Sequence, residues 1–356
     1  MDRLGGGLAR LCEVVGTEPE TPVELLAALL GPHGARPAAA PPVWPSDVAD
    51  DHSPVEFSLA FNDNEPPALR ILGEALGSPP GVRANMSAAE DVIEAYADRF
   101  GLSLRRLDMV RDLFDSHQPQ GAYALWLSLV FRNGRRPEFK VYFNPEVRGA
   151  GYAPELVGEA LHRLGLADAY RAMLAHAVRP GELGVRDRLT FFALDLYDEP
   201  QARVKVYLSH FDAEAHDVAR AASMVDGVDP EMVSGFCAAA GATRRFGARP
   251  LVGSYTITGD ADRPVGYSVY VPIRSYVEDD LQARSRVVEL LARHRFDTAL
   301  FDRALGALTA RPLSDGVGLI PHVSLRLGPP RPGVTVYLSA EAYGVLPPRT
   351  AGVQAA

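Results

Sequence analysis

The chain of 356 residues is 47% hydrophobic and 23% charged, so it can bury a large core. Its formal net charge of −9 argues against a nucleic-acid partner, and the absence of any apolar run of about 18 residues argues against a membrane partner. The two cysteines, Cys12 and Cys237, form neither a disulfide framework nor a zinc motif, and the N-terminus lacks the pattern of a signal peptide. We therefore expect a cytoplasmic protein.

The predicted elements follow one order five times, with two helices and then two strands. The helices are expected at about residues 4–16, 22–31, 87–100, 104–116, 153–165, 167–177, 212–224, 229–240, 276–294 and 298–309. The strand pairs are expected at residues 55–61 and 68–74, 123–131 and 138–144, 188–196 and 202–209, 251–258 and 265–272, and 318–327 and 333–339. Asn133-Gly134 is a strong signal for a tight turn in the second pair.

The composition also indicates several boundaries. Residues 35–54, rich in Ala and Pro, are expected to form an irregular connector inside one domain of residues 1–343. Residues 344–356 are expected to form a flexible C-terminal tail. Two helix starts are predicted from polar residues: Ser87-Ala-Ala-Glu90 matches a capping box, and Asp212 fits an N-cap.

A short motif recurs in the second strand of several pairs. The copies are about 65 residues apart and read Lys140-Val-Tyr142, Lys205-Val-Tyr207, Ser268-Val-Tyr270 and Thr335-Val-Tyr337. An earlier relative, Leu69-Arg-Ile-Leu72, places Arg70 at the position of the lysines. Because side chains alternate along a strand, each copy has an apolar face and a face that carries the basic and tyrosine residues.

Ten mostly antiparallel strands from consecutive hairpins predict an α+β protein with one large sheet, and closing that sheet into a barrel removes its edges. The helices are expected to cover the apolar outer face. The basic and tyrosine side chains would then point into the lumen. A closed barrel has no need of a partner, so we expect a monomer or a weak homodimer.

The expected lining of the lumen combines cations with tyrosines. Its members are Arg70, Lys140, Arg203, Lys205, Tyr142, Tyr207, Tyr270 and Tyr337. Clustered cations can bind a diphosphate through charge-assisted hydrogen bonds, and aromatic faces can shield a cation. This combination suits the ionisation of an allylic diphosphate. Glu56 could accept a hydrogen bond from an N–H group of a bound nucleophile, or it could be a surface or ion-paired residue.

Several of these segments together resemble the bacterial-like aromatic (indole) prenyltransferases of the dimethylallyltryptophan synthase type. The resemblance rests on Pro54-Val-Glu-Phe-Ser-Leu-Ala60, the following Arg70, the Lys-Val-Tyr strands and Arg203-Val-Lys-Val-Tyr207, and it covers about residues 50–340. It implies the ABBA (PT) barrel of that family, with Glu56 binding the indole N–H. It further implies that the diphosphate is bound by Arg70, Lys140, Arg203 and Lys205. The dimethylallyl cation would be shielded by Tyr142, Tyr207, Tyr270 and Tyr337.

A few positions depart from the family pattern. Ser268 stands where the family often has Gln, and His322 stands where it often has Tyr. The Arg expected at Gly328 is absent, and Arg326 is the candidate substitute in the diphosphate site. Fungal members carry a Lys, a candidate base, on the strand that here contains Trp126. Trp126, His322 and Ser268 are therefore expected to shape the acceptor pocket.

The resemblance implies an enzyme of secondary metabolism, of the kind used in alkaloid biosynthesis. It would transfer a dimethylallyl group from dimethylallyl diphosphate to the indole ring of tryptophan or a tryptophan-derived metabolite, by Friedel-Crafts-type substitution and without a metal or other cofactor. Its partners would be those two small molecules. Two alternatives stay open: a phenolic acceptor such as tyrosine or a naphthol-like ring, and a non-catalytic barrel that binds an anionic aromatic ligand.

Other acidic and histidine residues have structural interpretations. Glu278-Asp-Asp280 resembles half of an aspartate-rich motif that binds diphosphate through magnesium, but both aspartates fit the first turn of a helix. His210 and His216 lie near a junction between a strand and a helix, where they are expected to be packed or at the surface. We therefore expect no metal site.

Overall fold

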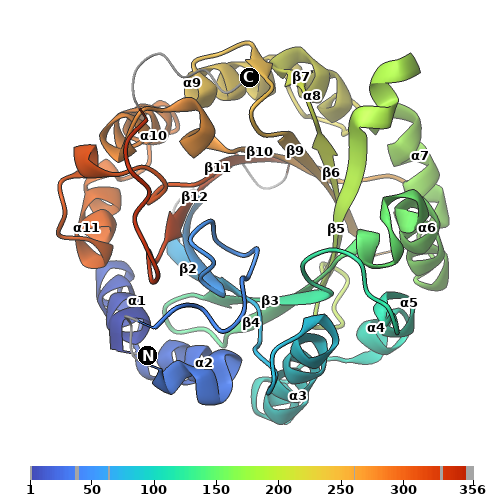
Figure 1. Cartoon of the computed structure of the whole chain (residues 1–356). Helices are drawn as coiled ribbons and strands as arrows, with labels where there is room; N and C mark the ends of the chain where they lie inside the picture. Colours follow the sequence, from blue (N-terminus) through green and yellow to red (C-terminus); the bar gives the residue numbers. More distant parts are fainter. Residues whose placement is uncertain (1, 37–39, 63–64, 260, 329–331, 350–356) are drawn as a thin grey trace.

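The computed structural model describes residues 2–36, 40–62, 65–259, 261–328 and 332–349. In this part of the chain, ten antiparallel strands close into a barrel in the order β1-β12-β11-β10-β9-β6-β5-β4-β3-β2 (Figure 1). They are β1 (Val55–Asn62), β2 (Glu65–Gly73), β3 (Leu125–Phe131), β4 (Glu138–Phe143), β5 (Asp187–Asp195), β6 (Arg203–His210), β9 (Leu251–Thr258), β10 (Gly266–Val271), β11 (Val323–Leu327) and β12 (Gly333–Ser339). The predicted closed α+β barrel is confirmed.

Helices surround this barrel as an outer ring (Figure 1). They are α1 (Asp2–Val15), α2 (Glu20–Leu30), α3 (Val82–Phe100), α4 (Arg105–Asp108), α5 (Arg111–Phe114), α6 (Ala153–Arg163), α7 (Ala167–Ala177), α8 (Ala215–Ala222), α9 (Pro230–Gly241), α10 (Asp280–Arg293) and α11 (Thr298–Leu308). Short 3-10 helices are η1 (Gly31–Ala35), η2 (Pro145–Arg148), η3 (Ala150–Tyr152), η4 (Gly181–Arg186), η5 (Ile273–Tyr276) and η6 (Leu313–Asp315). Two short strands, β7 (Ala213–Glu214) and β8 (Arg245–Phe246), pair outside the barrel.

The main hydrophobic core lies between the barrel and the helices. On β6, Val204, Val206 and Leu208 face outward into this core, because strand side chains alternate. Aromatic stacking joins the two layers where Phe114 of α5 meets Phe143 of β4, with ring centroids 4.4 Å apart. The opposite face of each strand is left to line the lumen.

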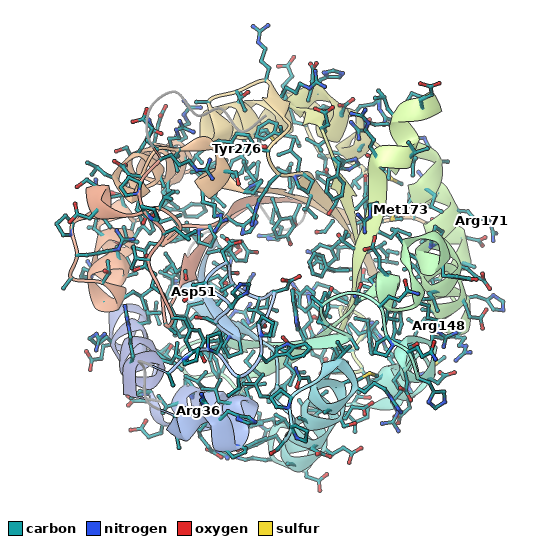
Figure 2. The ribbon with its side chains drawn as sticks, in the orientation of Figure 1. Arg36, Asp51, Arg148, Arg171, Met173 and Tyr276 are labelled. Atoms are coloured by element: carbon teal, nitrogen blue, oxygen red, sulfur yellow. The ribbon has the colours of Figure 1, made fainter. Side chains whose placement is uncertain are left out.

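The helices show the matching division. Met173 of α7 is fully buried and points toward the barrel, whereas Arg171 on the same helix projects from the outer surface (Figure 2). This amphipathic pattern is what a helix covering an apolar sheet requires.

Two predicted helix starts are wrong. Helix α3 begins at Val82 rather than at Ser87, because the side chain of Asn85 accepts hydrogen bonds from the backbone N–H groups of Gly77 and Gly81 and fixes an earlier entry. Asp212 has a positive φ of 50° and is not an N-cap. The cap of α8 is Glu214, which forms a capping box with Asp217.

Two other predicted elements are shorter than expected. The helix expected over 104–116 divides into α4 and α5, since Val110 leaves the helical region at φ −128°. The strand expected from residue 318 begins at Val323, after Pro321, which has no N–H group to donate to a neighbouring strand. The other expected helices and strands are present with small shifts of their ends.

The described part of the connector, residues 40–54, crosses one end of the barrel and is tied down at both of its ends. Near its start, Ser46 and Trp44 donate hydrogen bonds of 2.6 and 3.1 Å to the buried carboxylate of Glu74, at the end of β2. Near its end, Asp50 forms ion pairs with Arg249, at 2.6 Å, and Arg274. The connector is irregular, as expected, but it is anchored.

The beginning of the expected C-terminal tail is also anchored. Leu346 pairs with Val317 in an isolated bridge, and the backbone N–H of Arg349 donates to the carbonyl of Glu278. Residues 344–349 of the expected tail are therefore held against the rest of the protein, and residues 350–356 lie outside the described residues.

Within the described ranges, no helix combines the length and the apolarity needed to span a membrane.

Candidate active site

The lumen contains two adjoining cavities. The first, which we name the aromatic chamber, has a volume of about 190 Å³ and is lined by Asp47, Val48, Glu56, Leu72, Trp126, Phe191, Val252 and His322. The second, the cationic chamber, has a volume of about 60 Å³ and is lined by Arg132, Lys140, Arg203, Lys205, Ser268 and Arg326, among others. The two chambers share Arg70, Ser128 and four tyrosines, Tyr142, Tyr207, Tyr270 and Tyr337, whereas Ser58 lines the aromatic chamber alone.

The four shared tyrosines form a continuous row, the tyrosine belt, between the two chambers. Neighbouring ring centroids lie 5.7, 5.8 and 6.1 Å apart along the series Tyr142, Tyr207, Tyr270, Tyr337. Small residues on the strands between them leave room for the rings: Tyr142 pairs with Ala193, Tyr207 with Ser254 and Tyr270 with Ser324. The alternation predicted from the repeated motif therefore brings all four rings together.

Three of the belt tyrosines keep their protons. Burial raises the pKa of Tyr142 to about 12, and it raises the pKa of Tyr207 and of Tyr337 well above the usual value. The hydroxyl of Tyr207 donates to that of Tyr142 at 3.3 Å. These three residues thus present neutral hydroxyls and ring faces to both chambers.

Among the described residues, six cationic side chains line the cationic chamber: Arg70, Arg132, Lys140, Arg203, Lys205 and Arg326. The lysines are 7% exposed, and burial followed by repulsion from Arg203 lowers the pKa of each to about 7. The ammonium of Lys205 also lies 5.4 Å from the ring centroid of Tyr207. Within the described chain, Nε of Arg70 is buried without a hydrogen-bond partner. Such a cluster is electrostatically costly until an anion enters it.

Sequence reasoning missed three charged residues that line this chamber or lie directly beside its lining. Arg132, just after β3, forms an ion pair with Glu138 of β4. Asp195 of β5 lies behind the chamber wall, 3.0 Å from Nζ of Lys140 and 2.7 Å from Nε of Arg203. The signal that could have revealed Asp195 is an aspartate inside a strand, a position where Asp is depleted.

Arg326, the candidate substitute, does lie in the cationic chamber. It projects from β11, and its Nη2 donates a hydrogen bond of 3.1 Å to Oδ1 of Asn62. Ser268, which we expected beside Trp126 and His322, lies in this chamber instead, directly opposite Arg326 on the neighbouring strand. Ser268 therefore lies apart from Trp126 and His322, because its position along the barrel axis is level with the cations.

Glu56 points into the aromatic chamber from β1, so it is not a surface residue. It is 6% exposed, and burial, reinforced by the charge of Asp50, raises the pKa of its carboxyl well above the ordinary value. A buried carboxyl of this kind is a hydrogen-bonding group for a polar hydrogen or lone pair of a bound molecule.

One wall of the aromatic chamber is a stack of rings. Trp126 stacks on Tyr123 at 3.9 Å and 19°, and Phe191 lies 5.7 Å from Trp126. The indole Nε1 of Trp126 is buried and has no hydrogen-bond partner in the described ranges. Phe191 was missed, because an extra residue in β5 between Leu189 and Phe191 changes which residues of that strand face inward.

His322 completes this chamber opposite the stack. Its ring lies 6.1 Å from that of Tyr337 in an edge-on arrangement. Burial is the main cause that lowers the pKa of His322 to about 4, so the imidazole is neutral near pH 7. The chamber is thus lined mostly by uncharged rings and apolar side chains, with two carboxyl groups, those of Glu56 and Asp47.

The acidic and histidine residues considered for metal binding have other partners. Asp279 caps α10, and Asp280 holds Arg311 and accepts from the backbone N–H of Gly318. His210 is buried against Asp187, and His216 is largely exposed. Across the described residues, no cluster of three or more His, Cys, Asp or Glu could hold a metal ion.

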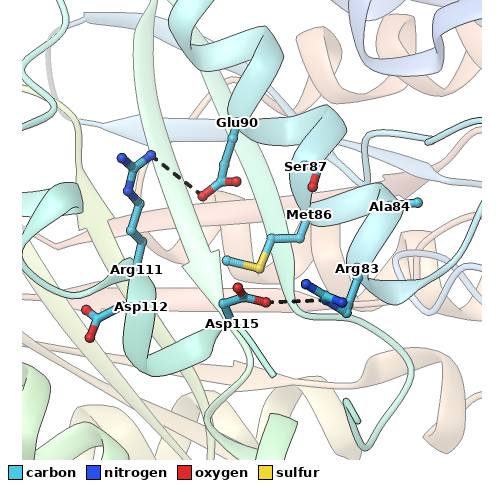
Figure 3. A pocket seen from close by; sticks show the side chains of 8 residues that line it. All are labelled: Arg83, Ala84, Met86, Ser87, Glu90, Arg111, Asp112 and Asp115. Carbon is cyan, nitrogen blue, oxygen red and sulfur yellow. Dashed lines mark ion pairs between the residues drawn. The ribbon is translucent and has the colours of Figure 1, made fainter. Parts of the chain in front are cut away.

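A further groove of about 400 Å³ lies outside the barrel, between α3 and α5 (Figure 3). Its charged residues pair with one another, Arg83 with Asp115 at 3.5 Å and Arg111 with Glu90 at 3.9 Å. These pairs are substantially exposed. The groove therefore offers no concentrated charge for a ligand.

Comparisons with known proteins agree with this geometry. A family model described as tryptophan dimethylallyltransferase matches residues 23–300. A 6-dimethylallyltryptophan synthase from Micromonospora olivasterospora, solved with DMASPP and Trp, is 67% identical over 98% of this chain and 99% of its own, with a TM-score of 0.95. Another structure named 6-dimethylallyl tryptophan synthase is 66% identical, covers 98% of both chains and has the same TM-score.

A 5-dimethylallyl tryptophan synthase from Streptomyces coelicolor, also solved with DMASPP and Trp, is more distant. It is 36% identical over 99% of this chain and 98% of its own, with a TM-score of 0.89. From the family match and these identities, the chain belongs to the tryptophan dimethylallyltransferase family and is a prenyltransferase with the ABBA barrel.

Proposed function

We propose that this enzyme transfers the dimethylallyl group of dimethylallyl diphosphate to C6 of the indole ring of L-tryptophan, without a metal ion. The observation that carries the proposal is the tyrosine belt, which separates a cluster of cations from an aromatic chamber that holds Glu56. A donor spanning the belt has its diphosphate among the cations and its allyl group among the rings.

The cationic chamber supports the role proposed for the diphosphate-binding residues. The basic residues of this chamber surround the space in which negative charge would develop on the bridging oxygen of the diphosphate as the C–O bond of the donor breaks. They are Arg70, Lys140, Arg203, Lys205 and Arg326. Preorganised cations stabilise such a leaving group more in the transition state than in the ground state. They would neutralise the charge of the diphosphate, as magnesium does in enzymes that bind diphosphate through an aspartate-rich motif.

The belt supports the role proposed for the tyrosines. Their rings can stabilise the allyl cation through their faces, and their burial excludes water that would capture it. Attack by the indole ring carbon then forms the new C–C bond, and loss of the ring proton restores aromaticity. The products are prenylated tryptophan, diphosphate and one proton.

The position of Glu56 supports the choice of an indole as the acceptor. As a carboxylate it can accept the indole N–H, which orients the ring and increases electron density at its carbons. The stack formed by Trp126 and Phe191 offers a flat surface against which an indole can lie. The choice of C6 rests on the two relatives of 66% and 67% identity, both named for position 6.

We also propose that residues 1–343 act as one domain and as a monomer, since the closed barrel leaves no strand edge to pair. The cytoplasmic location stays a prediction.

The test is to incubate the purified protein with dimethylallyl diphosphate and L-tryptophan in the presence of EDTA, and to analyse the products by mass spectrometry and NMR. We expect 6-dimethylallyltryptophan at the same rate with and without EDTA. A Lys205→Met variant serves as the negative control. Loss of activity with EDTA, restored by magnesium, would contradict metal independence, and a product at another ring position would contradict the choice of C6. Turnover with L-tyrosine but not L-tryptophan would favour the phenolic alternative.

A further inference from the structure

We propose that Asp195 is a positioning residue of the donor site, which holds Lys140 and Arg203 charged and in place to bind diphosphate. This inference rests on the proposed function, because it assigns the cationic chamber to the diphosphate of the donor. Asp195 does not line the chamber and is 2% exposed, so it acts through its two basic neighbours rather than by contact with the substrate.

The geometry around Asp195 is that of a bridge between adjacent strands. Asp195 on β5 is directly opposite Lys140 on β4, and its Oδ1 lies 3.0 Å from Nζ of that lysine. Its Oδ2 accepts from Nε of Arg203 on β6 at 2.7 Å and from the backbone N–H of Arg203 at 2.9 Å. The hydroxyl of Tyr197 donates to the same oxygen at 2.9 Å. One carboxylate therefore fixes two cations from two strands.

The neighbours of this bridge are almost all basic. Lys140 is faced by Arg203 and Lys205 on β6, and it shares the chamber with Arg70, Arg132, Arg326, Tyr142, Tyr207, Tyr270 and Tyr337. Asp195 is also influenced by Arg106 of α4, and Glu138 of β4 lies 4.0 Å from Arg203. The attraction of Asp195 opposes the burial and the repulsion that lower the pKa of Lys140 to about 7. Lys140 and Arg203 in turn hold the pKa of Asp195 well below its usual range.

Removing Asp195 has two opposite consequences for an anion. Loss of a negative charge increases the attraction of the chamber for diphosphate at every pH. Loss of the bridge lowers the pKa of Lys140 further. Above pH 7, protonating Lys140 on binding then costs a larger part of the binding free energy. Loss of the bridge also releases Arg203 from its fixed position. The weakening of diphosphate binding caused by losing the bridge grows as the pH rises, whereas the strengthening caused by losing the negative charge does not. The pH dependence therefore distinguishes a positioning role from a simple charge effect.

The experiment measures the affinity of inorganic diphosphate by calorimetry at pH 6 and pH 8 for the wild-type protein and Asp195→Asn. We expect Asp195→Asn to bind within about threefold of wild type at pH 6 and at least about tenfold more weakly at pH 8. Equal ratios at the two pH values, or tighter binding at both, would overturn the proposal.

Asp187→Asn is the matched control. Asp187 is also a buried carboxylate of β5, but its ion-pair partners are Arg179, at 2.8 Å, and His210, at 3.0 Å. We expect this variant to lose thermal stability while keeping the wild-type ratio of diphosphate affinities. The same shift in ratio for Asp187→Asn and Asp195→Asn would overturn the assignment, because it would be a general effect of losing a buried charge.

If Asp195→Asn does not fold, Asp195→Glu replaces it. The retained charge should keep the affinity ratio between pH 6 and pH 8 within about twofold of wild type, while the longer side chain weakens binding at both pH values. A changed ratio in Asp195→Glu would overturn the proposal. These measurements involve no acceptor and no turnover, so an absence of prenyl transfer would contradict the proposed function without affecting this result. A wild-type protein that binds no diphosphate would contradict both.

Discussion

The two chambers of the lumen bury ionisable groups in opposite ways. In the cationic chamber, repulsion and burial lower the pKa of both lysines to about 7, and Asp195 and Glu138 offset part of the remaining charge. In the aromatic chamber, the pKa of Glu56 is raised and that of His322 falls to about 4, so both groups are biased toward their neutral forms. The tyrosine belt is the boundary between them. The difference indicates that this barrel concentrates charge on the side of the tyrosine belt where the diphosphate group leaves.

The strongest test of this division is to remove Lys205, a cation that forms no ion pair with an acidic side chain in the described part of the chain. We expect Lys205→Met to lower kcat/KM for dimethylallyl diphosphate by about 10³-fold, the upper range for one preorganised electrostatic group. Steady-state kinetics with saturating tryptophan measures this. Arg105→Gln, which breaks an exposed ion pair with Asp198, should stay within about twofold of wild type. A loss below about tenfold for Lys205→Met would contradict the role of the cationic chamber.

The complementary test removes the carboxyl group on the aromatic side. We expect Glu56→Gln to lower kcat/KM for tryptophan by about 10²-fold, because the amide accepts the indole N–H less strongly than a carboxylate. The affinity for inorganic diphosphate, measured by calorimetry, should not change. A large loss of diphosphate affinity would mean that the chambers are not separate.

The chambers should also respond to pH in opposite directions. Lys140 and Lys205 are charged below a pKa of about 7, so kcat/KM for the donor should fall above pH 7, by up to about tenfold per pH unit for each proton lost. Glu56 accepts the N–H most strongly when it is ionised, and its raised pKa predicts that kcat/KM for tryptophan rises with pH through that pKa. Measuring kcat/KM against pH, first with the donor varied and then with tryptophan varied, would separate the fall due to the lysines from the rise due to Glu56. A donor profile that stays flat from pH 6 to pH 9 would contradict the lowered lysine pKa values.

The smallest effect is expected at the boundary itself. Tyr207→Phe keeps the ring and removes the hydroxyl that donates to Tyr142, so kcat should fall by less than about threefold. Tyr207→Ala opens the belt to water, and we expect a larger share of the donor to be hydrolysed to alcohol rather than transferred. Product ratios by mass spectrometry test both variants. Equal hydrolysis in Tyr207→Phe and Tyr207→Ala would show that the ring is not the shield.

Much of this arrangement could be predicted from the sequence, because it depends on local alternation. The period of two in Lys140-Val-Tyr142 and its copies assigns the first and third residues of each motif to the lumen, and the five repeated hairpins predict the closed barrel. Arg70 was placed by the same pattern, whereas the role of Glu56 in the lumen was implied by the resemblance to the prenyltransferase family. These features require no knowledge of which strands become neighbours.

The features that were missed depend on pairing between strands. Asp195 matters because the register sets it opposite Lys140, and Ser268 belongs with the cations because of its level along the barrel axis. Phe191 faces inward only because β5 contains one extra residue before it. The capping box at Ser87 was overridden by Asn85, whose side chain binds backbone groups outside the helix. Local patterns cannot supply this information.

The position of the hydrophobic core, between the barrel and its helices, has a consequence for how such a protein can change over evolutionary time. Residues such as Val206 and Phe143 hold the two layers together from the outer face of the strands, while the residues that meet substrate stand on the other face. A mutation in the lumen therefore removes few of the contacts that keep the chain folded. New acceptors can be explored by exchanging inward side chains one at a time, with the architecture left intact.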